Sequence, residues 1–148
     1  ESPVIQSCTI HVGDSVCILP VGHPHCAADC ILPDMLEEES FISFCGDAAY
    51  RREIDEIFKV AGVNRILSYE ARTTEAVCGL VSAGLGVSIV GPLPPTTSRH
   101  RAQAQNFEFR PFKPAPSVTL SLIWPTNRAL SASAKEFIKV VRQHFNSP

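Results

Sequence analysis

The sequence predicts an α/β fold built around a mostly parallel sheet. Between residues 40 and 91, strand-like and helix-like segments alternate, which is typical of parallel strands joined by right-handed helical crossovers. With 45% hydrophobic and 19% charged residues, the composition is that of an ordinary globular protein. A chain of 148 residues buries about 70% of its unfolded surface. It is therefore long enough for one domain, or two small lobes, with a true core.

The first third of the chain predicts two strands followed by a connection. Residues 4–10 alternate loosely between apolar and polar side chains, and residues 15–19 form a continuous apolar run that ends at Pro20. A short run of this kind favours a strand that is buried on both faces of a sheet. Residues 21–34 contain one glycine and two prolines, so they predict a connection with at most one helical turn after it.

The segment from 40 to 62 predicts a strand, a turn and an amphipathic helix. Ser40–Phe44 is strand-like, and residues 45–47 form a turn in which Asp47 is the candidate N-cap. Gly62 is expected to end the helix, because glycine readily adopts the left-handed conformation that follows a helix C-terminus. One apolar helix face is predicted from the spacing of Tyr50, Ile54, Ile57, Phe58 and Ala61.

A second strand–helix–strand unit follows. Residues 64–70 predict a strand, and Thr73 or Thr74 is expected to cap the next helix, with Glu75 in its first turn. The buried stripe of this helix is predicted to consist of Val77, Leu80 and Val81. Gly84 ends the helix, and residues 87–90 predict the next strand.

The last third predicts a loop, two strands and a terminal helix. Residues 92–105 are rich in proline, threonine and serine, whereas residues 107–112 and 117–124 are strand-like. Residues 131–144 predict a helix. Its buried face is expected to contain Phe137, Ile138, Val141 and Phe145.

The charge, the uncharged run and the cysteines argue against a nucleic-acid-binding, a membrane-spanning and a disulfide-bonded protein, respectively. Thirteen basic and fifteen acidic residues give a net charge of −2, which lacks the basic footprint of a self-sufficient nucleic-acid binder. The uncharged run 76–98 contains four glycines and three prolines, so we predict a helix, a turn and a strand there and no membrane span. Residues 1–3 do not resemble a signal peptide, so the six cysteines are expected to be reduced in a cytoplasmic protein.

Two loops are candidates for a ligand site. In open α/β sheets, ligands bind beyond the carboxyl ends of strands, at helix N-termini. Free N–H groups there can hold a carboxylate, while acidic side chains and hydroxyls can fix an amino or guanidino group. The predicted ligand-binding residues are Ser43, Phe44, Cys45, Gly46, Asp47, Glu70, Arg72 and Thr73. The alternative is that Asp47 and Thr73 act only as helix caps.

Other chemistry is weakly supported. His23, His25, Cys26 and Cys30 crowd into eight residues, whereas zinc ligands normally come as two separated pairs, so we predict an ordinary loop and no metal site. Cys45 precedes a helix but lacks the motif of a thiol hydrolase. The sequence also lacks a dinucleotide-binding loop, and no cofactor is predicted. The basic residues Arg51, Arg52, Lys135, Lys139 and Arg142 are expected on solvated helix faces.

Several segments resemble one bacterial family, the LysR-type transcriptional regulators. Residues 81–90 resemble the family's Ala-Gly-x-Gly stretch between a helix and a strand. Residues 16–24 are similar to its strand followed by Pro-x-x-His-Pro, and residues 41–43 to its Phe-Ile strand. Glu70, with the helix that begins near Thr73, is similar to its strand–helix joint. Val77, Cys78 and residues 117–123 are similar to the regulators of lysine biosynthesis and of octopine and nopaline catabolism.

The resemblance implies a two-lobed fold like that of periplasmic binding proteins, with one lobe complete and the other partial. Residues 1–26 and 111–148 would form the partial first lobe, and residues 27–110 the second. A small amino-acid-like or opine effector would bind in the cleft, where Ser43, Cys45, Gly46 and Asp47 match the family's ligand-facing loop and Thr73 faces it. The resemblance also implies a homodimer or tetramer, and DNA binding only through an N-terminal winged helix-turn-helix that this sequence does not contain.

Two rival hypotheses remain beside this non-enzymatic sensor. One is a thiol-dependent enzyme that uses Cys45 as its nucleophile, because a helix N-terminus lowers a thiol pKa. The other is a self-associating interaction module, because the missing half-lobe would leave an open sheet edge that can pair with another copy.

Overall fold

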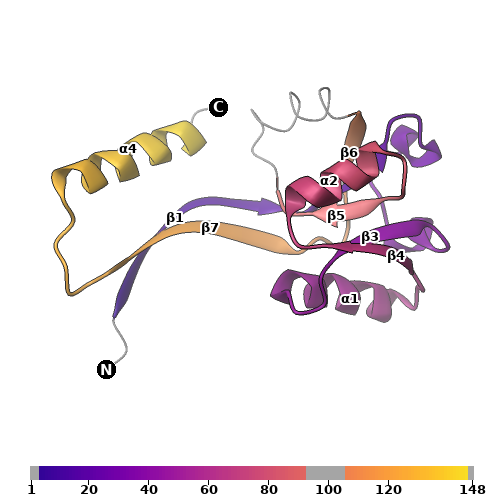
Figure 1. The fold of residues 1–148 in the computed structure, drawn as a ribbon, viewed down its shortest axis with the longest axis horizontal. Coiled ribbons are helices and arrows are strands. Elements are labelled where there is room, and N and C mark those ends of the chain that lie inside the picture. The colour runs from indigo at the N-terminus through magenta and orange to yellow at the C-terminus, as the bar shows by residue number, and fades with distance from the viewer. Residues whose placement is uncertain (1–3, 93–105, 147–148) are drawn as a thin grey trace. The chain divides into compact units, whose positions relative to one another are not determined.

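The computed structural model describes residues 4–92 and 106–146, which form two compact units. The smaller unit comprises Glu1–Gly13 and Val118–Pro148, and the larger comprises Asp14–Ser117. Figure 1 shows the elements of both units. The predicted loop 92–105 lies, from residue 93 onward, outside the described residues. None of the helices in the described part of the chain has the length and apolar character that crossing a membrane requires.

The smaller unit consists of a two-stranded sheet and one helix. Strand β1 (Ile5–Asp14) pairs with β7 (Ser117–Pro125), and α4 (Ala132–Asn146) follows β7. Trp124 Nε1 donates to Gln6 Oε1 across the strands at 2.8 Å. Of the face predicted for α4, Phe137 is 59% exposed. That part of the prediction is wrong, because helical spacing identifies a stripe but does not show what the stripe packs against.

The central sheet of the larger unit has the order β5-β2-β6 and is antiparallel. Strand β2 (Val16–Pro20) pairs with β5 (Ser88–Val90) on one side and with β6 (Phe107–Pro111) on the other. Cys17, Ile18 and Leu19 in its apolar run are completely buried, as predicted for a strand covered on both faces, whereas Val16 is half-buried. The sheets are therefore less parallel than the sequence predicted, because long-range partners set the direction of β2.

The parallel part of the fold is the pair formed by β3 (Ser40–Phe44) and β4 (Ile66–Ala71). Helix α1 (Ala49–Ala61) connects these strands. It ends at Gly62, as predicted, where a φ of 70° places the backbone in the left-handed region and the N–H bonds to the carbonyls of Phe58 and Lys59. Val87, which immediately precedes β5, forms one parallel bridge with Phe41 of β3. The predicted β-α-β-α-β order is thus present, but its last strand is connected to β3 by a single β-bridge only.

Helices α1 and α2 (Thr74–Ser82) cover different faces of β3 (Figure 1). Phe41 packs in one buried cluster with Ile54 and Phe58 of α1. Its neighbour Ile42 packs in a second cluster with Val77 and other residues of α2. Because successive side chains of a strand point to opposite faces, β3 separates the two core clusters.

Gly86 allows the turn before β5 to approach β3 closely. Its φ is 152°, and a Cβ atom at this position would overlap the carbonyl oxygen of Ser40. That oxygen accepts a hydrogen bond from Val87 N at 2.8 Å, and Ser40 Oγ donates to Leu85 O at 2.8 Å. Only glycine fits this position without strain.

The compact units do not coincide with the predicted lobes, whose boundaries stay a prediction. Residues 14–26 and 111–117, which we expected in the first lobe, belong to the larger unit. Pairing of β2 with both β5 and β6 explains why residues 16–20 group with the larger unit. The connection after β2 contains two short 3-10 helices, η1 (Pro24–Ala27) and η2 (Pro33–Leu36).

Candidate functional site

The two predicted ligand loops lie at the same edge of the β3–β4 pair. The strands run parallel, with Ser43 opposite Glu70 and Phe44 opposite Ala71, so both carboxyl ends meet there. The loops are also tied directly, because Cys45 N donates to Ala71 O at 3.1 Å. The predicted convergence of these loops is confirmed. We call this place the carboxyl edge: residues 43–47 and 70–73 with the first turns of α1 and α2.

Helix α1 begins at the carboxyl edge without a side-chain cap. Its N-cap is Ala48, not Asp47 as predicted, because Ala48 O accepts the first helical hydrogen bonds, from Arg51 N and Arg52 N. The side chain of Asp47 is 75% exposed and lies 3.7 Å from Arg72 Nη1, which is also exposed. Since alanine has no acceptor, the first N–H groups of α1 have no capping side chain to satisfy them.

Helix α2 begins with a conventional cap. Thr73 Oγ1 accepts from Ala76 N at 3.2 Å, and Glu75 lies in the first turn. This confirms one of the two caps that the sequence proposed. The Thr73 hydroxyl therefore accepts a hydrogen bond from its own helix. The two helix starts differ, because a side chain caps the N–H groups of α2 but not those of α1.

Two buried hydroxyl groups lie close to the start of α1 in the chain. Ser43 is 1% exposed, and neither its Oγ nor the Tyr50 hydroxyl has a hydrogen-bond partner among the described residues. Phe44 packs edge-on against Tyr50, with ring centroids 5.5 Å apart. Burial raises the pKa of Tyr50 to about 12. Buried polar atoms normally have a hydrogen-bond partner, so these two hydroxyl groups are exceptions.

Arg51 holds the carboxyl edge together, and the prediction that it lies on a solvated helix face is wrong. Its side chain is only 9% exposed. Nη1 donates to Phe44 O at 2.8 Å and to Glu70 Oε1 at 2.7 Å, while Nε donates to both Asp55 oxygens at 2.7 and 2.8 Å. Burial opposes its charge, but these hydrogen bonds outweigh burial and raise the pKa of Arg51 above its usual value.

The charged network continues away from the carboxyl edge. Arg65 forms an ion pair with Asp55, and its guanidinium lies over the rings of Phe41 and Phe58 at 4.7 and 4.3 Å. Burial lowers the pKa of Arg65, although Asp55 opposes this effect. A signal for the burial of Arg51 was present in the sequence, because it lies three and seven residues before Ile54 and Phe58 on one helix face.

Cys45 is a free, partly buried thiol. No described hydrogen bond joins its sulfur to a histidine or to any other base. Within the described residues, therefore, Cys45 lacks the thiol–base pair that nucleophilic catalysis requires.

The histidine-rich turn serves a local structural purpose. His23 is the N-cap of η1, and its Nδ1 accepts from His25 N at 3.2 Å. The Nε2 atoms of both histidines lie 3.5 and 3.7 Å from Glu39 Oε1. Among the described residues, no group of three potential ligands could hold a metal ion.

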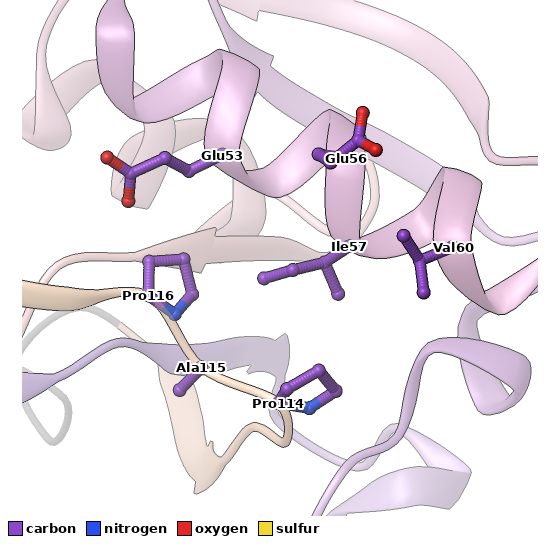
Figure 2. A pocket seen from close by; sticks show the side chains of 7 residues that line it. All are labelled: Glu53, Glu56, Ile57, Val60, Pro114, Ala115 and Pro116. Carbon is purple, nitrogen blue, oxygen red and sulfur yellow. The ribbon is translucent and has the colours of Figure 1, made fainter.

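A separate groove lies between α1 and the segment that follows β6, and none of its lining residues belongs to the two predicted ligand loops (Figure 2). Its volume is about 430 Å³. Figure 2 shows Ile57 and Val60 facing the segment that follows β6. The groove is lined by Glu53, Glu56, Ile57, Val60, Pro114, Ala115 and Pro116. None of these residues was predicted as part of a site.

Comparison with curated proteins identifies regulators as relatives. The transcriptional activator protein LysR of Escherichia coli is 36% identical over 124 residues, which cover 84% of this chain and 39% of that protein. The transcriptional dual regulator GltC of Bacillus subtilis is 29% identical over 129 residues, which cover 87% and 42%. The chain thus spans about two fifths of the length of these relatives.

Solved structures show the same fold. The Synechocystis CcmR regulatory domain in complex with 2-PG matches with a TM-score of 0.74 at 15% identity, covering 99% of this chain and 70% of that one. The effector-binding domain of QuiR in complex with shikimate matches with a TM-score of 0.71 at 20% identity, covering 95% and 65%. These neighbours confirm the predicted α/β fold of the periplasmic-binding-protein type.

The pattern of one family covers nearly all of the chain. It matches residues 13–146 and is described as the LysR substrate binding domain. Its match agrees with the relatives, which are transcriptional regulators, and with the folds of the structural neighbours. The chain belongs to the LysR substrate-binding domain family.

Proposed function

We propose that this chain is the effector-sensing part of a bacterial transcriptional regulator and that it binds a small amino-acid-like or opine ligand at the carboxyl edge. The observation that carries the proposal is the parallel register of β3 and β4, which brings two helix starts to one edge. Small molecules in two structural neighbours, 2-PG with CcmR and shikimate with QuiR, support an effector of small size.

The start of α1 suits the carboxylate of such a ligand. Its first N–H groups lack a side-chain cap, and the N-terminal end of a helix carries partial positive charge. Gly46, which precedes it, is exposed and has open space around its Cα. Thr73 caps α2, so the carboxylate is expected at α1 and not at α2.

Regulation then follows from differential binding. A ligand at the carboxyl edge shifts the protein toward whichever conformation binds it more tightly. We propose that this shift reaches a winged helix-turn-helix elsewhere in a longer regulator, which acts as a dimer or tetramer. The proposal includes no catalytic step, because no base among the described residues forms a hydrogen bond with the Cys45 thiol.

Calorimetric titration of the chain with arginine, lysine, octopine and nopaline tests the proposal. We expect saturable binding of at least one of them, and a loss of about tenfold or more when the free carboxylate of that ligand is replaced by an amide, because a charge-assisted hydrogen bond is lost. An affinity that is unchanged for the amide analogue would contradict the proposed carboxylate site at the start of α1. Absence of binding for all four would contradict the proposed ligand class.

A second candidate function, self-association, has one specific observation in its favour. Strand β4 is at the edge of its sheet and exposes Ile66, Leu67 and Tyr69 by 53%, 46% and 42%. An exposed apolar edge strand is a template for pairing with another chain. We propose that copies of this chain associate through β4, which is compatible with the sensor function.

A further inference from the structure

Glu70 is the acidic side chain at the carboxyl edge whose position is set by a buried partner. It stands near the end of β4, and its side chain is 50% exposed. Arg51 Nη1 donates to one carboxylate oxygen, Oε1, at 2.7 Å. The other oxygen, Oε2, makes no hydrogen bond or ion pair within the described part of the chain. Glu70 therefore presents one free acceptor in a fixed orientation.

Arg51 cannot easily release Glu70. Its guanidinium also bonds to Phe44 O and to both oxygens of Asp55, so it joins the end of β3, the end of β4 and helix α1. Moving Arg51 toward a ligand would break these hydrogen bonds and leave Asp55 without this partner. Arg51 is thus a positioning residue, and Glu70 is the group that remains available for binding.

The charged groups around Glu70 largely offset one another, because Arg51 pairs with both Glu70 and Asp55, and Asp55 also pairs with Arg65. Ser43 lies directly opposite Glu70 in the strand register, but its side chain is only 1% exposed, so a ligand would reach Glu70 and not Ser43. Asp47 and Arg72 are both exposed and lie 3.7 Å apart, so their charges largely offset each other. The start of α1 provides the opposite polarity, because its N–H groups attract anions.

We infer that Glu70 is a specificity-determining residue that selects effectors carrying an ammonium or guanidinium group, with Arg51 holding its carboxylate in place. This inference rests on the proposed function, since it concerns the same carboxyl edge. It adds the residue that recognises the cationic nitrogen group of such a ligand, while the start of α1 holds its carboxylate. Purely anionic effectors are disfavoured.

The test compares ligands that differ by one positive charge. Arginine is titrated into the chain alongside citrulline, which replaces the guanidinium with a neutral urea group, and Nα-acetylarginine, which neutralises the amine; lysine is compared with norleucine in the same way. In the wild-type chain, one of these replacements should weaken binding about tenfold or more, as expected for loss of a charged hydrogen bond. In Glu70→Gln, the same replacement should cost less than about twofold, because the amide still accepts from Arg51 but carries no charge.

The matched control is Glu56→Gln, which removes the same charge from α1 at a side chain that is 60% exposed and pairs with Lys59. It should preserve the wild-type preference. A preference that persists unchanged in Glu70→Gln would overturn the inference and leave the effector site intact. Failure of arginine, lysine, octopine and nopaline to bind would overturn the proposed ligand class and the inference with it, because octopine and nopaline also carry a guanidinium group.

Discussion

Arg51 illustrates how one side chain connects several elements of this protein. Its buried guanidinium bonds to the end of β3, to Glu70 of β4 and to Asp55 within α1. Burial of a charge is costly unless it is paired and hydrogen-bonded, and here both conditions are met. The residue therefore contributes to stability through its partners as much as through its own packing.

Replacement of Arg51 by methionine should lower the free energy of unfolding by about 2–4 kcal/mol, because the buried hydrogen bonds to Phe44, Glu70 and Asp55 are lost together. Urea unfolding monitored by circular dichroism measures the change. Its neighbour Arg52 is exposed, so Arg52→Met should stay within about 0.5 kcal/mol of wild type. Equal effects of the two variants would show that the Arg51 network contributes nothing to stability.

Stability at alkaline pH should depend on Tyr50. Burial raises the pKa of its hydroxyl to about 12, so the folded protein keeps this proton more tightly than the unfolded chain, whose tyrosines titrate near pH 10. The contribution to stability is complete below about pH 10 and is lost as the pH rises toward about 12. Urea midpoints between pH 8 and 11.5 should fall less steeply in Tyr50→Phe.

Part of the alkaline loss should persist in that variant. Burial also raises the pKa of the Cys17 thiol, which titrates in the same direction. A Tyr50→Phe profile that runs parallel to wild type over the whole range would show that the phenol does not contribute.

Replacement by alanine should have opposite effects on stability at Gly86 and at Gly79. A methyl group at Gly86 would overlap Ser40 O and strain a backbone with φ of 152°, so Gly86→Ala should destabilise the chain by about 2–4 kcal/mol. Gly79 lies in α2 with open space around it, so Gly79→Ala should stabilise by about 0.5–1 kcal/mol. Thermal melts of the two variants should shift in opposite directions.

At the scale of elements, the β3–α1–β4 unit combines the candidate site and the candidate interface. Its carboxyl ends form the carboxyl edge, while β4 is also the outer strand of the pair. Parallel strands need a crossover helix between them, so the loops that follow both strands must lie at the same edge. That constraint explains why the sequence could predict the neighbouring loops before the structure was known.

A lysine in β4 should weaken self-association. Leu67 is 46% exposed on the edge strand, and a charge there opposes pairing with a second copy. We expect Leu67→Lys to shift the chain toward monomer in sedimentation experiments, whereas Val60→Lys on α1, at a side chain that is 79% exposed, should not. A wild-type chain that sediments as a monomer, or a Leu67→Lys variant that associates normally, would rule out this edge.

At the scale of the whole molecule, the buried core is concentrated in the larger unit. Both clusters of buried residues lie within residues 14–117, whereas in the described part of the smaller unit only Cys8 and Ile10 are buried apolar side chains. The two units should therefore differ in local stability, because resistance to opening increases with buried apolar contact.

Hydrogen exchange can measure this difference. Amides of β2, whose residues 17–19 are fully buried, should exchange at least about tenfold more slowly than those of β7, where exposed and half-buried residues alternate. Native-state exchange with mass spectrometry resolves the two strands. Equal protection of β2 and β7 would show that the chain opens as a single cooperative body.

The sequence by itself determined the features that depend on neighbours in the chain. The apolar run 15–19, the helix stop at Gly62 and the cap at Thr73 all follow from short-range sterics and hydrogen bonding, and the structure contains each of them. The parallel arrangement of β3 and β4 followed as well, because the helix between them leaves few other topologies.

Only the tertiary structure decided features that depend on distant partners. The antiparallel pairing of β2, the burial of Arg51 and the exposure of Phe137 each require knowledge of which element packs against which. Asp47 lost its predicted capping role to Ala48 because the exact residue at which a helix begins depends on the backbone of the whole turn. Periodicity specifies which side of an element is apolar, but the partner that covers that side is set by contacts far apart in the chain.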